Sequence, residues 1–390
     1  MAIMVGKTAL IVGAGIGGLS AALGLLKVGF TVKLCERSNS LQDVGAGITL
    51  RPSANRALHY LGLYDVLLDM GSRPPSMPVM HYKTLQVLVR RMAVVPRPAD
   101  FPMMQVHRAD LIKVMADALG RQAPDAMRFG RYLIGFDQTD DSVTARFADG
   151  SEEKGDILIG CDGVRSAARA QMFGADSPRF TGQVAWRCLI PMERVRHLVS
   201  GCPGGTYIGP GRVFTRYPIR QGALLNSVAF AQTDAWRGEG WSTPSTREEL
   251  KAQFAGWHGD VLGLIDQAPS EGLIKWALFD RDPLPIWSKG RASLLGDAAH
   301  PMLPFLGLGA GVALEDSVVL ARALAETDRI PAGLQRYEAA RRDRSARILL
   351  ASRVQGEIYG RADPENYATT ERPSADIALV EDYDPVSVAI

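Results

Sequence analysis

Three glycines near the N-terminus have the spacing of a phosphate-binding turn. Gly13, Gly15 and Gly18 form G-x-G-x-x-G directly after an apolar segment and directly before an Ala/Leu-rich one. Gly13 permits a tight turn, Gly15 lets a pyrophosphate approach the backbone, and Gly18 allows a helix to pack closely on a strand. The N-terminus of that helix offers unpaired N–H groups and the positive end of its dipole to phosphates. The pattern predicts a bound dinucleotide without distinguishing FAD from NAD.

A carboxylate after the next apolar segment supports this prediction. Glu36 ends that segment, where its side chain can accept hydrogen bonds from ribose hydroxyls. A negative charge there disfavours a 2′-phosphate, so NADP is not expected in this first site. The glycines alone are also compatible with a plain tight turn. Dinucleotide binding is favoured because the strand, the helix and Glu36 occur in the order and at the spacing that such a site requires.

Two further aspartates follow apolar strands later in the chain. Asp162 lies in the segment ILIGCDGVRSAAR, which ends in Arg169, and Asp297 lies in LLGDAAHP. Both segments place a carboxylate at the end of a predicted strand, where nucleotide sites of α/β proteins form. The alternatives are a buried ion pair of Asp162 with Arg169 and a helix cap for Asp297.

With these three motifs in this order, the chain resembles the single-component FAD-dependent aromatic hydroxylases (class A flavoprotein monooxygenases). The salicylate, 3-hydroxybenzoate and 6-hydroxynicotinate branch is the most similar, and the resemblance extends to the final Asp382-Tyr-Asp-Pro. It implies FAD as cofactor and NADH or NADPH as co-substrate. In such enzymes O2 adds to the reduced flavin, and the resulting C4a-hydroperoxide hydroxylates an electron-rich ring. A phenolic aromatic acid or a related hydroxylated ring is therefore the expected substrate.

The resemblance also implies roles for individual residues. Asp297 is expected to bind the ribityl chain of FAD, and Arg108 to approach the phosphate–ribityl region. Asp162 and Arg169 are expected to serve both FAD and the nicotinamide donor. The backbone at the start of a predicted helix is expected to face the flavin ring and stabilise its negative charge. The remaining positions implied for the FAD site are Arg37, Leu133, Gly309 and Ala310.

The substrate wall is expected in the β-rich middle of the chain. Tyr217 falls where related enzymes place an active-site aromatic residue, and Arg187 and Arg216 are candidates to anchor a substrate carboxylate. A strand-face arginine in a surface ion pair is the alternative for both. Relatives carry histidines where this chain has Val213, Thr49 and Phe305, so the usual base is missing and Tyr217 is the remaining proton-relay candidate.

Other residues near these motifs are given structural roles. His300 is expected to cap the loop after Gly296-Asp297 rather than act as a base. The segment 304–306 is apolar and is expected to pack against the substrate ring. No group of residues has the spacing of a metal site, so no metal is expected.

Competing functions remain open at this stage. A halogenase would need paired tryptophans where this chain has only Trp186 in WRCLIP. A non-oxygenating FAD oxidoreductase and a module that binds FAD only as a ligand share the same fold. Among oxygenases, a carboxylated phenol is the first expectation because of the two arginines. An N-heteroaromatic acid is the next, and purine or polyketide-like rings are further alternatives.

The elements that position these residues alternate in type. Strand 8–12, helix 19–27 and strand 30–35 indicate a parallel α/β sheet, whereas 79–98 and 182–230 are typical of antiparallel strands. Helices are predicted over 310–326 and 333–356. The fold class is therefore α/β, a Rossmann-like FAD-binding domain interleaved with a smaller β-sheet substrate domain, plus a C-terminal helix, as in p-hydroxybenzoate hydroxylase. The expected boundaries are 1–78, 102–178 and 275–330 for the first, 79–101 and 179–274 for the second, and 331–390 for the helix and tail.

Composition limits the partners. The 390 residues carry 44 basic and 42 acidic side chains, so neither nucleic acid nor an anionic membrane is expected. Apolar runs are shorter than the roughly 18–20 residues of a membrane span. The four cysteines fit a reducing compartment, and we expect a cytoplasmic protein. It should act as a monomer or homodimer on a small aromatic substrate and O2.

Overall fold

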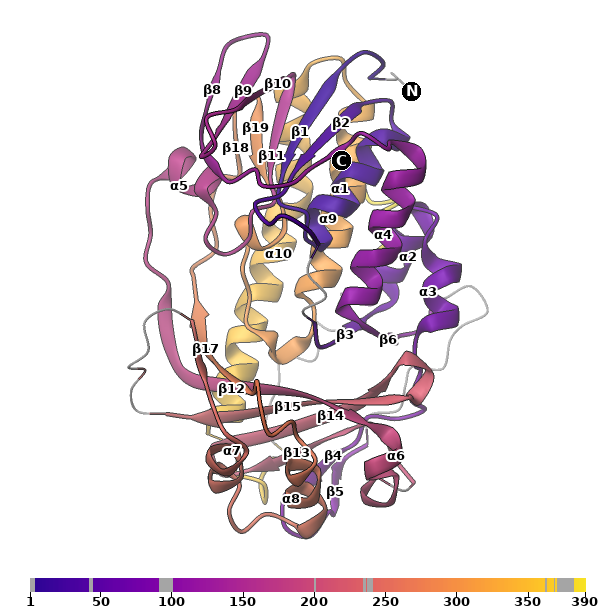
Figure 1. Cartoon of the computed structure of the whole chain (residues 1–390), viewed down its shortest axis with the longest axis vertical. Helices are drawn as coiled ribbons and strands as arrows, with labels where there is room; N and C mark the ends of the chain where they lie inside the picture. Colours follow the sequence, from indigo (N-terminus) through magenta and orange to yellow (C-terminus); the bar gives the residue numbers. More distant parts are fainter. Residues whose placement is uncertain are drawn as a thin grey trace.

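Two large β-sheets lie at opposite ends of the molecule, with long helices between them (Figure 1). The computed structural model describes residues 4–41, 45–90, 101–199, 201–233, 236, 241–361, 363–367, 369 and 382–390. Of the β-rich segment predicted over 79–98, residues 91–98 lie outside this description. The predicted α/β fold class with an interleaved β-sheet unit is confirmed.

The first large sheet has six strands and is mainly parallel. β1 pairs in parallel with β2 and with β11, and β11 with β19, as the alternation of strand and helix signals predicts. Helices cover one face of this sheet and a small three-stranded sheet covers the other. Its central strands are therefore apolar on both faces. In order, the strands are β18 (Ser288–Lys289), β19 (Ala292–Leu294), β11 (Ile157–Gly160), β1 (Thr8–Val12), β2 (Thr31–Cys35) and β7 (Met127–Arg128).

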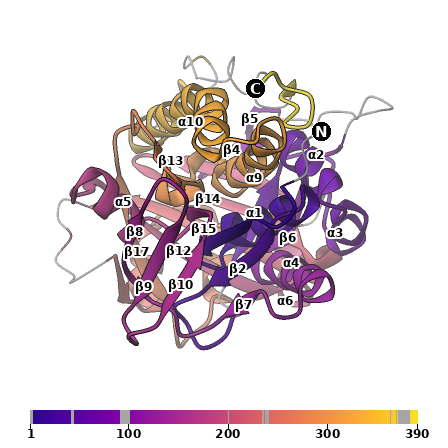
Figure 2. The ribbon, with the colours of Figure 1, turned by 90° about the horizontal axis from the view of Figure 1, so that it is seen from above.

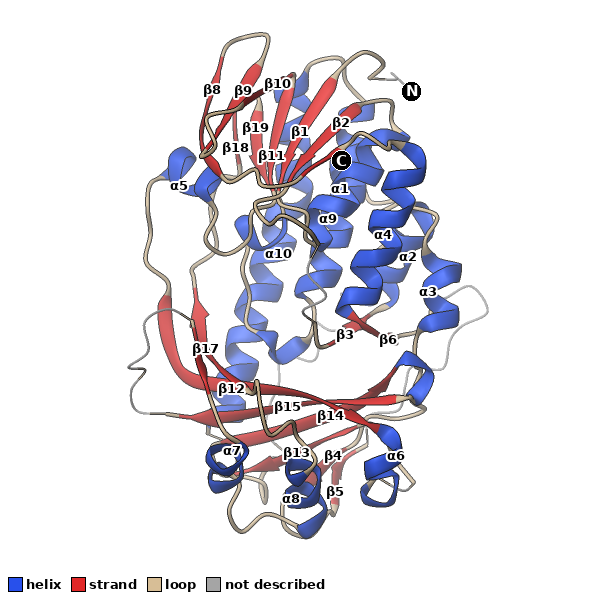
Figure 3. Cartoon of the chain, viewed as in Figure 1, coloured by secondary structure: helices blue, strands red, loops and turns tan. Residues whose placement is uncertain are grey.

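Helices pack on one side of this sheet and extend towards the second large sheet (Figure 3). α1 packs against α4 and α9, and α9 packs against α2 and α10. α1 begins at Ile16, three residues before its predicted start, because the glycine turn leads directly into the helix. The helices are α1 (Ile16–Lys27), α2 (Pro52–Tyr60), α3 (Tyr64–Met70), α4 (Arg108–Gln122), α5 (Ala167–Phe173), α9 (Gly309–Ala325) and α10 (Ile330–Gly360).

The second large sheet has eight strands and forms the other end of the molecule. Its long central strands β12, β15 and β14 are antiparallel, as their alternating pattern predicts. Trp186 and Phe214 point from one face into a core that α7 and α8 cover, and the opposite face turns towards the helices. The strands are β16 (Ser242–Pro244), β17 (Ile274–Asp280), β12 (Arg179–Pro191), β15 (Leu224–Gln232), β14 (Arg212–Ile219), β13 (Gly205–Gly209), β4 (Val79–His81) and β5 (Val87–Val89).

Smaller elements complete the molecule. A three-stranded sheet covers the face of the six-stranded sheet that is opposite to α9 and α10 (Figure 2). It contains β8 (Leu133–Gln138), β9 (Val143–Phe147) and β10 (Glu152–Gly155). A two-stranded ribbon is formed by β3 (Gly47–Leu50) and β6 (Met104–His107). The short helices are α6 (Met192–Val195), α7 (Arg247–Gln253), α8 (Gly259–Asp266), η1 (Arg196–Leu198), η2 (Arg220–Gly222), η3 (Gly296–Ala298) and η4 (Pro304–Leu306).

One expected domain boundary needs adjustment. β17 pairs with β12 and β16 in the eight-stranded sheet, although the expected boundary at residue 275 assigns most of it to the FAD-binding unit. We therefore propose that the chain returns to the FAD-binding unit after Asp280. Among the residues that the structure describes, no helix combines the length and apolar character that a membrane span requires.

Candidate active site

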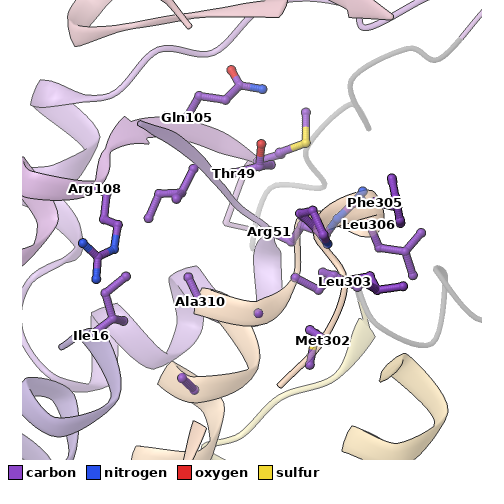
Figure 4. Close-up of a pocket in the computed structure, with 18 of the residues that line it drawn as sticks. Ile16, Thr49, Arg51, Gln105, Arg108, Met302, Leu303, Phe305, Leu306 and Ala310 are labelled. Carbon is purple, nitrogen blue, oxygen red and sulfur yellow. The ribbon is translucent and has the colours of Figure 1, made fainter. Parts of the chain in front are cut away.

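A cavity of about 960 Å³ lies between the N-terminus of α9, the β3–β6 ribbon and the inner face of the eight-stranded sheet (Figure 4). One part of its wall contains the glycine turn, Arg108 and Asp297. Another part contains Arg187 and Tyr217 from the eight-stranded sheet. The cavity thus brings together residues that the sequence places in separate motifs.

The charges on the described cavity wall favour anionic ligands. Five arginines and two aspartates line it, without lysine or glutamate among the lining residues that the structure describes. A concave surface with this surplus attracts phosphates and carboxylates. The charged lining residues are Arg51, Arg56, Arg90, Arg108, Arg187, Asp297 and Asp382.

The three glycines of the turn have different roles: two are required by the fold, and one faces the cavity. Gly13 has φ +100°, and a Cβ there would overlap with the Cys161 carbonyl. A Cβ on Gly18 would overlap with the carbonyl oxygen of Gly13. On Gly15, in contrast, a Cβ would meet no atom within 4 Å, and this residue lines the cavity. The open backbone at Gly15 fits a pyrophosphate at the N-terminus of α1.

Glu36 is held beside this turn. Its Oε2 accepts a hydrogen bond from the Ala14 N–H at 2.8 Å, and its Oε1 accepts from the Ser38 N–H at 2.9 Å. Each carboxylate oxygen keeps acceptor capacity for a ribose hydroxyl. Arg37 is exposed, and Leu133 is buried in β8; neither lies in the cavity wall. The roles of these three residues towards FAD stay predictions.

Asp297 and Arg108 lie in one electrostatic environment. Asp297 follows β19 and faces the cavity, with protein around it; burial raises the pKa of its carboxyl, while the charges of His300 and Arg108 lower it. Arg108 begins α4, and burial lowers the pKa of its guanidinium, while Asp297 raises it. A carboxylate and a cation thus face the cavity together, which suits the hydroxyl-rich and phosphate-bearing parts of FAD.

Asp162 and Arg169 have protein partners instead. Asp162 accepts hydrogen bonds from the Ser166 hydroxyl at 2.5 Å and from the Ala167 N–H at 2.7 Å, so it caps α5. Arg169 donates to the Ala299 carbonyl at 3.0 Å and pairs with an exposed aspartate, Asp176. Neither side chain lines the cavity. Arg169 therefore fixes the loop that carries Asp297, and direct contact of Asp162 or Arg169 with FAD or nicotinamide stays a prediction.

The start of α9 presents free backbone donors to the cavity. Gly309 and Ala310 are its first residues and line the cavity, and its first turn contains no acidic side chain. Gly307 precedes them in the left-handed conformation with φ +66°, which turns the chain from η4 into α9. The positive end of the α9 dipole therefore points to the place where a flavin ring with negative charge would bind.

Arg187 and Tyr217 share the inner face of the eight-stranded sheet. Arg187 pairs in register with Val228, and Val228 with Thr215, so these residues form a row across β12, β15 and β14. Tyr217 lies two residues further along β14 on the same face. Arg187 makes no hydrogen bond or ion pair with another described residue. Its guanidinium is thus available for a ligand carboxylate.

The Tyr217 phenol is buried and keeps its proton. Burial raises the pKa of its hydroxyl well above the usual value, while the charge of Arg187 and a hydrogen bond with the Thr49 hydroxyl lower it. Burial also lowers the pKa of Arg187, and Tyr217 raises it. Thr49 is the residue found where 6-hydroxynicotinate enzymes carry a histidine, and here it forms a hydrogen-bonded pair with the phenol.

The prediction for Arg216 needs correction. Its side chain points to the opposite face of β14 from Tyr217, because neighbouring residues of a strand alternate. Its guanidinium donates to the Tyr207 hydroxyl at 2.7 Å and to the Cys202 carbonyl at 2.6 Å. Arg216 is buried away from the cavity, so it does not contact a substrate there.

His300 is buried below the cavity wall. Its Nε2 lies 2.6 Å from Asp316 Oδ2, and Arg341 donates to the other oxygen of Asp316 at 2.7 Å. Asp316 also accepts from the Gly296 N–H at 3.2 Å. This network supports the Gly296–Asp297 loop from beneath, in agreement with the predicted structural role of His300.

Sequence reasoning missed Gln105 on β6. Gln105 is a lining residue of the cavity and lies directly opposite Thr49, and Figure 4 shows both side chains on the same side of the ribbon. The only signal in the sequence was a polar residue between the apolar Met104 and Val106, three positions before Arg108.

Comparison with known proteins agrees with this geometry. A family model described as "FAD binding domain" matches residues 7–352. The chain is 36% identical to 3-amino-4-hydroxybenzoate 2-monooxygenase of Streptomyces platensis over 376 residues, 96% of this chain and 93% of that protein. It is 34% identical to 6-hydroxynicotinate 3-monooxygenase of Pseudomonas fluorescens over 363 residues, 91% and 92% of the two chains.

A solved structure of the same class is similar over the whole length. A salicylate hydroxylase in complex with its substrate matches with a TM-score of 0.81 and 29% identity, covering 97% of this chain and 96% of that one. The predicted resemblance is thereby confirmed. With its glycine turn, its cavity and these relatives, the chain belongs to the family of FAD-dependent aromatic monooxygenases.

Proposed function

We propose that this enzyme hydroxylates a small aromatic acid with a ring hydroxyl, using O2 and NADH or NADPH. One observation carries the proposal: Arg187, a cavity cation without a carboxylate partner among the described residues, lies on the same wall as the buried phenol of Tyr217. The names of two relatives support this class, because 3-amino-4-hydroxybenzoate and 6-hydroxynicotinate are both aromatic acids with a ring hydroxyl.

When bound, FAD supplies the redox chemistry by which nicotinamide electrons activate O2 for transfer to the ring. The chain contributes the positions of its polar groups. In this proposal Gly15 and the N-terminus of α1 hold the pyrophosphate, and Asp297 accepts from the ribityl hydroxyls. The N–H groups at Gly309 and Ala310 stabilise negative charge on the ring system.

Arg187 anchors the carboxylate of the substrate. A guanidinium can form two parallel hydrogen bonds with a carboxylate, which fixes both the distance and the plane of the acid. Because burial lowers the pKa of Arg187, a bound carboxylate also relieves the cost of keeping this cation in the cavity. The ring is then oriented along the sheet towards Tyr217.

In this proposal the Tyr217 oxygen accepts a hydrogen bond from the ring hydroxyl. As the ring proton moves to Tyr217, Tyr217 passes its own proton to Thr49, and Thr49 passes one to water at the β3–β6 ribbon. A phenolate is a better nucleophile towards electrophilic oxygen than a phenol, so removing this proton activates the ring. Tyr217 holds its own proton and contacts the Thr49 hydroxyl. The two hydroxyls form a short relay from the substrate to the β3–β6 ribbon.

Apolar side chains enclose the ring and exclude water. Val228 and Phe230 line the cavity from β15, and Leu303 and Phe305 line it from the segment before α9. The Phe230 and Phe305 rings contact each other at a centroid distance of 5.0 Å, with their planes tilted by 50°. A dry wall protects a reactive oxygen donor from hydrolysis and strengthens the polar contacts to the substrate.

We further propose a cytoplasmic enzyme that acts as a monomer or homodimer. All four cysteines are free thiols, and burial raises the pKa of the Cys35 and Cys188 thiols to about 12, so these two resist oxidation. This chemistry suits a reducing compartment in which NADH and NADPH are available.

The test is a substrate screen with the purified flavin-loaded enzyme. NADH and NADPH oxidation and O2 uptake are measured with hydroxybenzoates, 3-amino-4-hydroxybenzoate and 6-hydroxynicotinate, each beside the same ring without its carboxylate. We expect at least one acid to stimulate both rates and to yield a product whose ring has gained one oxygen atom, with its carboxylate either kept or released as CO2. Stimulation of NAD(P)H oxidation without O2 uptake would instead indicate a non-oxygenating oxidoreductase. A panel in which no acid stimulates contradicts the proposal.

A further inference from the structure

We propose that the Gln105 carboxamide recognises the substrate. It would bind two adjacent uncharged groups on the edge of the aromatic ring, one a hydrogen-bond donor and the other an acceptor. The ligand class is an aromatic acid that carries an amino group beside its hydroxyl, or a cyclic amide in the ring. This inference rests on the proposed function and narrows its substrate class.

Gln105 lies in the wall of the cavity, close to the proposed proton relay. It occupies the middle of β6, directly opposite Thr49 on β3. Directly opposed residues of an antiparallel pair have Cβ atoms about 5 Å apart on the same face. Thr49 in turn hydrogen-bonds with Tyr217. The carboxamide is therefore one cross-strand pair away from the phenol (Figure 4).

The carboxamide has no protein partner in the described part of the chain. The residue is 0% exposed, yet neither Oε1 nor Nε2 makes a hydrogen bond. Other buried amides nearby have at least one partner: Gln183 donates to the Gly356 carbonyl at 3.0 Å, and Asn226 accepts from the Gly47 N–H at 2.7 Å, although its Nδ2 is unpaired. Buried polar atoms in native proteins nearly always have partners. An amide with both ends unpaired at a cavity wall thus points to a partner inside the cavity.

The chemistry of the amide defines that partner. A carboxamide presents one acceptor and one donor group side by side and carries no charge. The complementary ligand offers a donor and an acceptor at adjacent positions, as an amino group beside a hydroxyl or an N–H beside a carbonyl does. A substituent next to the hydroxyl that contacts Tyr217 is placed to reach Gln105, while Arg187 holds the carboxylate.

The experiment compares ligand selectivity in the flavin-loaded enzyme. Dissociation constants are measured by flavin absorbance for a hydroxybenzoate, for the same ring with an amino group beside the hydroxyl, for the ring with a methyl group in that place, and for a pyridone carboxylate. The enzymes are wild type, Gln105→Met and Gln105→Glu. Gln122→Met, the same change at the exposed end of α4, is the matched control. Turnover with each ring is recorded in parallel.

We expect wild type to bind the amino-substituted ring or the pyridone at least about tenfold more tightly than the methyl-substituted ring, because a paired buried amide rejects a partner that cannot hydrogen-bond. Gln105→Met should abolish this selectivity and change the binding of the plain hydroxybenzoate less than about threefold. The control variant should behave as wild type. If wild type prefers only the amino-substituted ring or only the pyridone, that preference identifies which of the two ring types the site binds.

Three outcomes overturn the subsite. Turnover of aromatic acids with equal affinity for amino- and methyl-substituted rings in wild type leaves the proposed function intact and shows that water satisfies the amide. Unchanged selectivity in both Gln105 variants has the same meaning. If no ring binds to the wild-type enzyme, the proposed substrate class fails and the subsite fails with it. The wild-type comparison of ligands holds even if a variant does not fold.

Discussion

Arg187 and Tyr217 face the cavity from the same side of the eight-stranded sheet, and each opposes the effect of burial on the other. The charge of Arg187 lowers the pKa of the phenol, and Tyr217 raises the pKa of the guanidinium. A cation for the carboxylate and a hydroxyl for the phenol are thereby fixed on one rigid wall. The proposed mode of substrate binding depends on this pair.

Replacement of Arg187 by Met should weaken binding of a carboxylated substrate. Loss of a bidentate, charge-assisted contact costs about 2–3 kcal/mol, so KM should rise roughly 30-fold or more while flavin content stays unchanged. Steady-state kinetics with the acid and with its methyl ester measure the effect. The ester should be a poor substrate for both enzymes, and Arg121→Met on the exposed end of α4 should change nothing. Equal loss with acid and ester would exclude a carboxylate contact.

Replacement of Tyr217 by Phe should uncouple hydroxylation from NAD(P)H oxidation. Loss of a proton relay typically lowers the rate about 100-fold, and the unused oxygen then appears as hydrogen peroxide. Because burial raises the pKa of Tyr217, its hydroxyl stays protonated at neutral pH, so no step of the pH–rate profile below about 10 belongs to its ionisation. The ratio of product to peroxide is measured at saturating substrate. An unchanged ratio and rate would remove Tyr217 from the mechanism.

Asp297→Asn should stabilise the apoprotein and weaken FAD binding. Burial raises the folded pKa of this carboxyl, so the folded state binds its proton more tightly than the unfolded chain. Stability is therefore lost as pH rises from the unfolded pKa, near 3.9, through the folded pKa, and the ionised carboxylate is a net cost at pH 7. Because the Asp297 side chain still opens to the cavity, the gain in Tm at pH 7 should be small and should vanish towards pH 4, while FAD affinity should fall by about tenfold.

The control for this prediction is Asp125→Asn at an exposed position. It should alter neither Tm nor FAD affinity. A lower apoprotein Tm for Asp297→Asn at pH 7 would show that the carboxylate stabilises the fold rather than the cofactor.

Alanine substitutions in the glycine turn should separate folding from FAD binding. A Cβ on Gly18 overlaps with the Gly13 carbonyl, so Gly18→Ala should lower the Tm of the apoprotein by several degrees. A Cβ on Gly15 meets no atom within 4 Å, so Gly15→Ala should keep the apoprotein Tm and weaken FAD binding about tenfold or more. Thermal unfolding and FAD titration test both variants. Normal FAD affinity in Gly15→Ala would place the pyrophosphate elsewhere.

Local motifs made part of this site predictable from the sequence. The glycine turn and Asp297 belong to strand-end patterns, in which spacing alone defines the geometry. Alternation along β14 would also have separated Tyr217 from Arg216, but an arginine in a strand is equally compatible with either face until the register of the sheet is known. Arg216 and Tyr217 are neighbours in β14, so their side chains point to opposite faces and only one of them can line the cavity.

Other relationships depend on tertiary packing and leave no mark in the sequence. Thr49 and Tyr217 come from different sheets, so their hydrogen bond follows only from how the ribbon lies on the large sheet. Asp162 caps a helix that begins only five residues later. The sequence of this motif would be the same if Asp162 contacted a cofactor instead, so the sequence could not distinguish the two roles. Gln105 became visible only because burial without partners can be recognised in the structure.

The most direct test of the central claim is isotope incorporation. The flavin-loaded enzyme is supplied with NAD(P)H, the best aromatic acid of the screen and 18O2 in unlabelled water, and the product is weighed by mass spectrometry. A monooxygenase should place one 18O atom in each hydroxylated product and oxidise NAD(P)H stoichiometrically. Product that carries oxygen from water, or labelled hydrogen peroxide as the sole oxygen product with every aromatic acid, would contradict this claim.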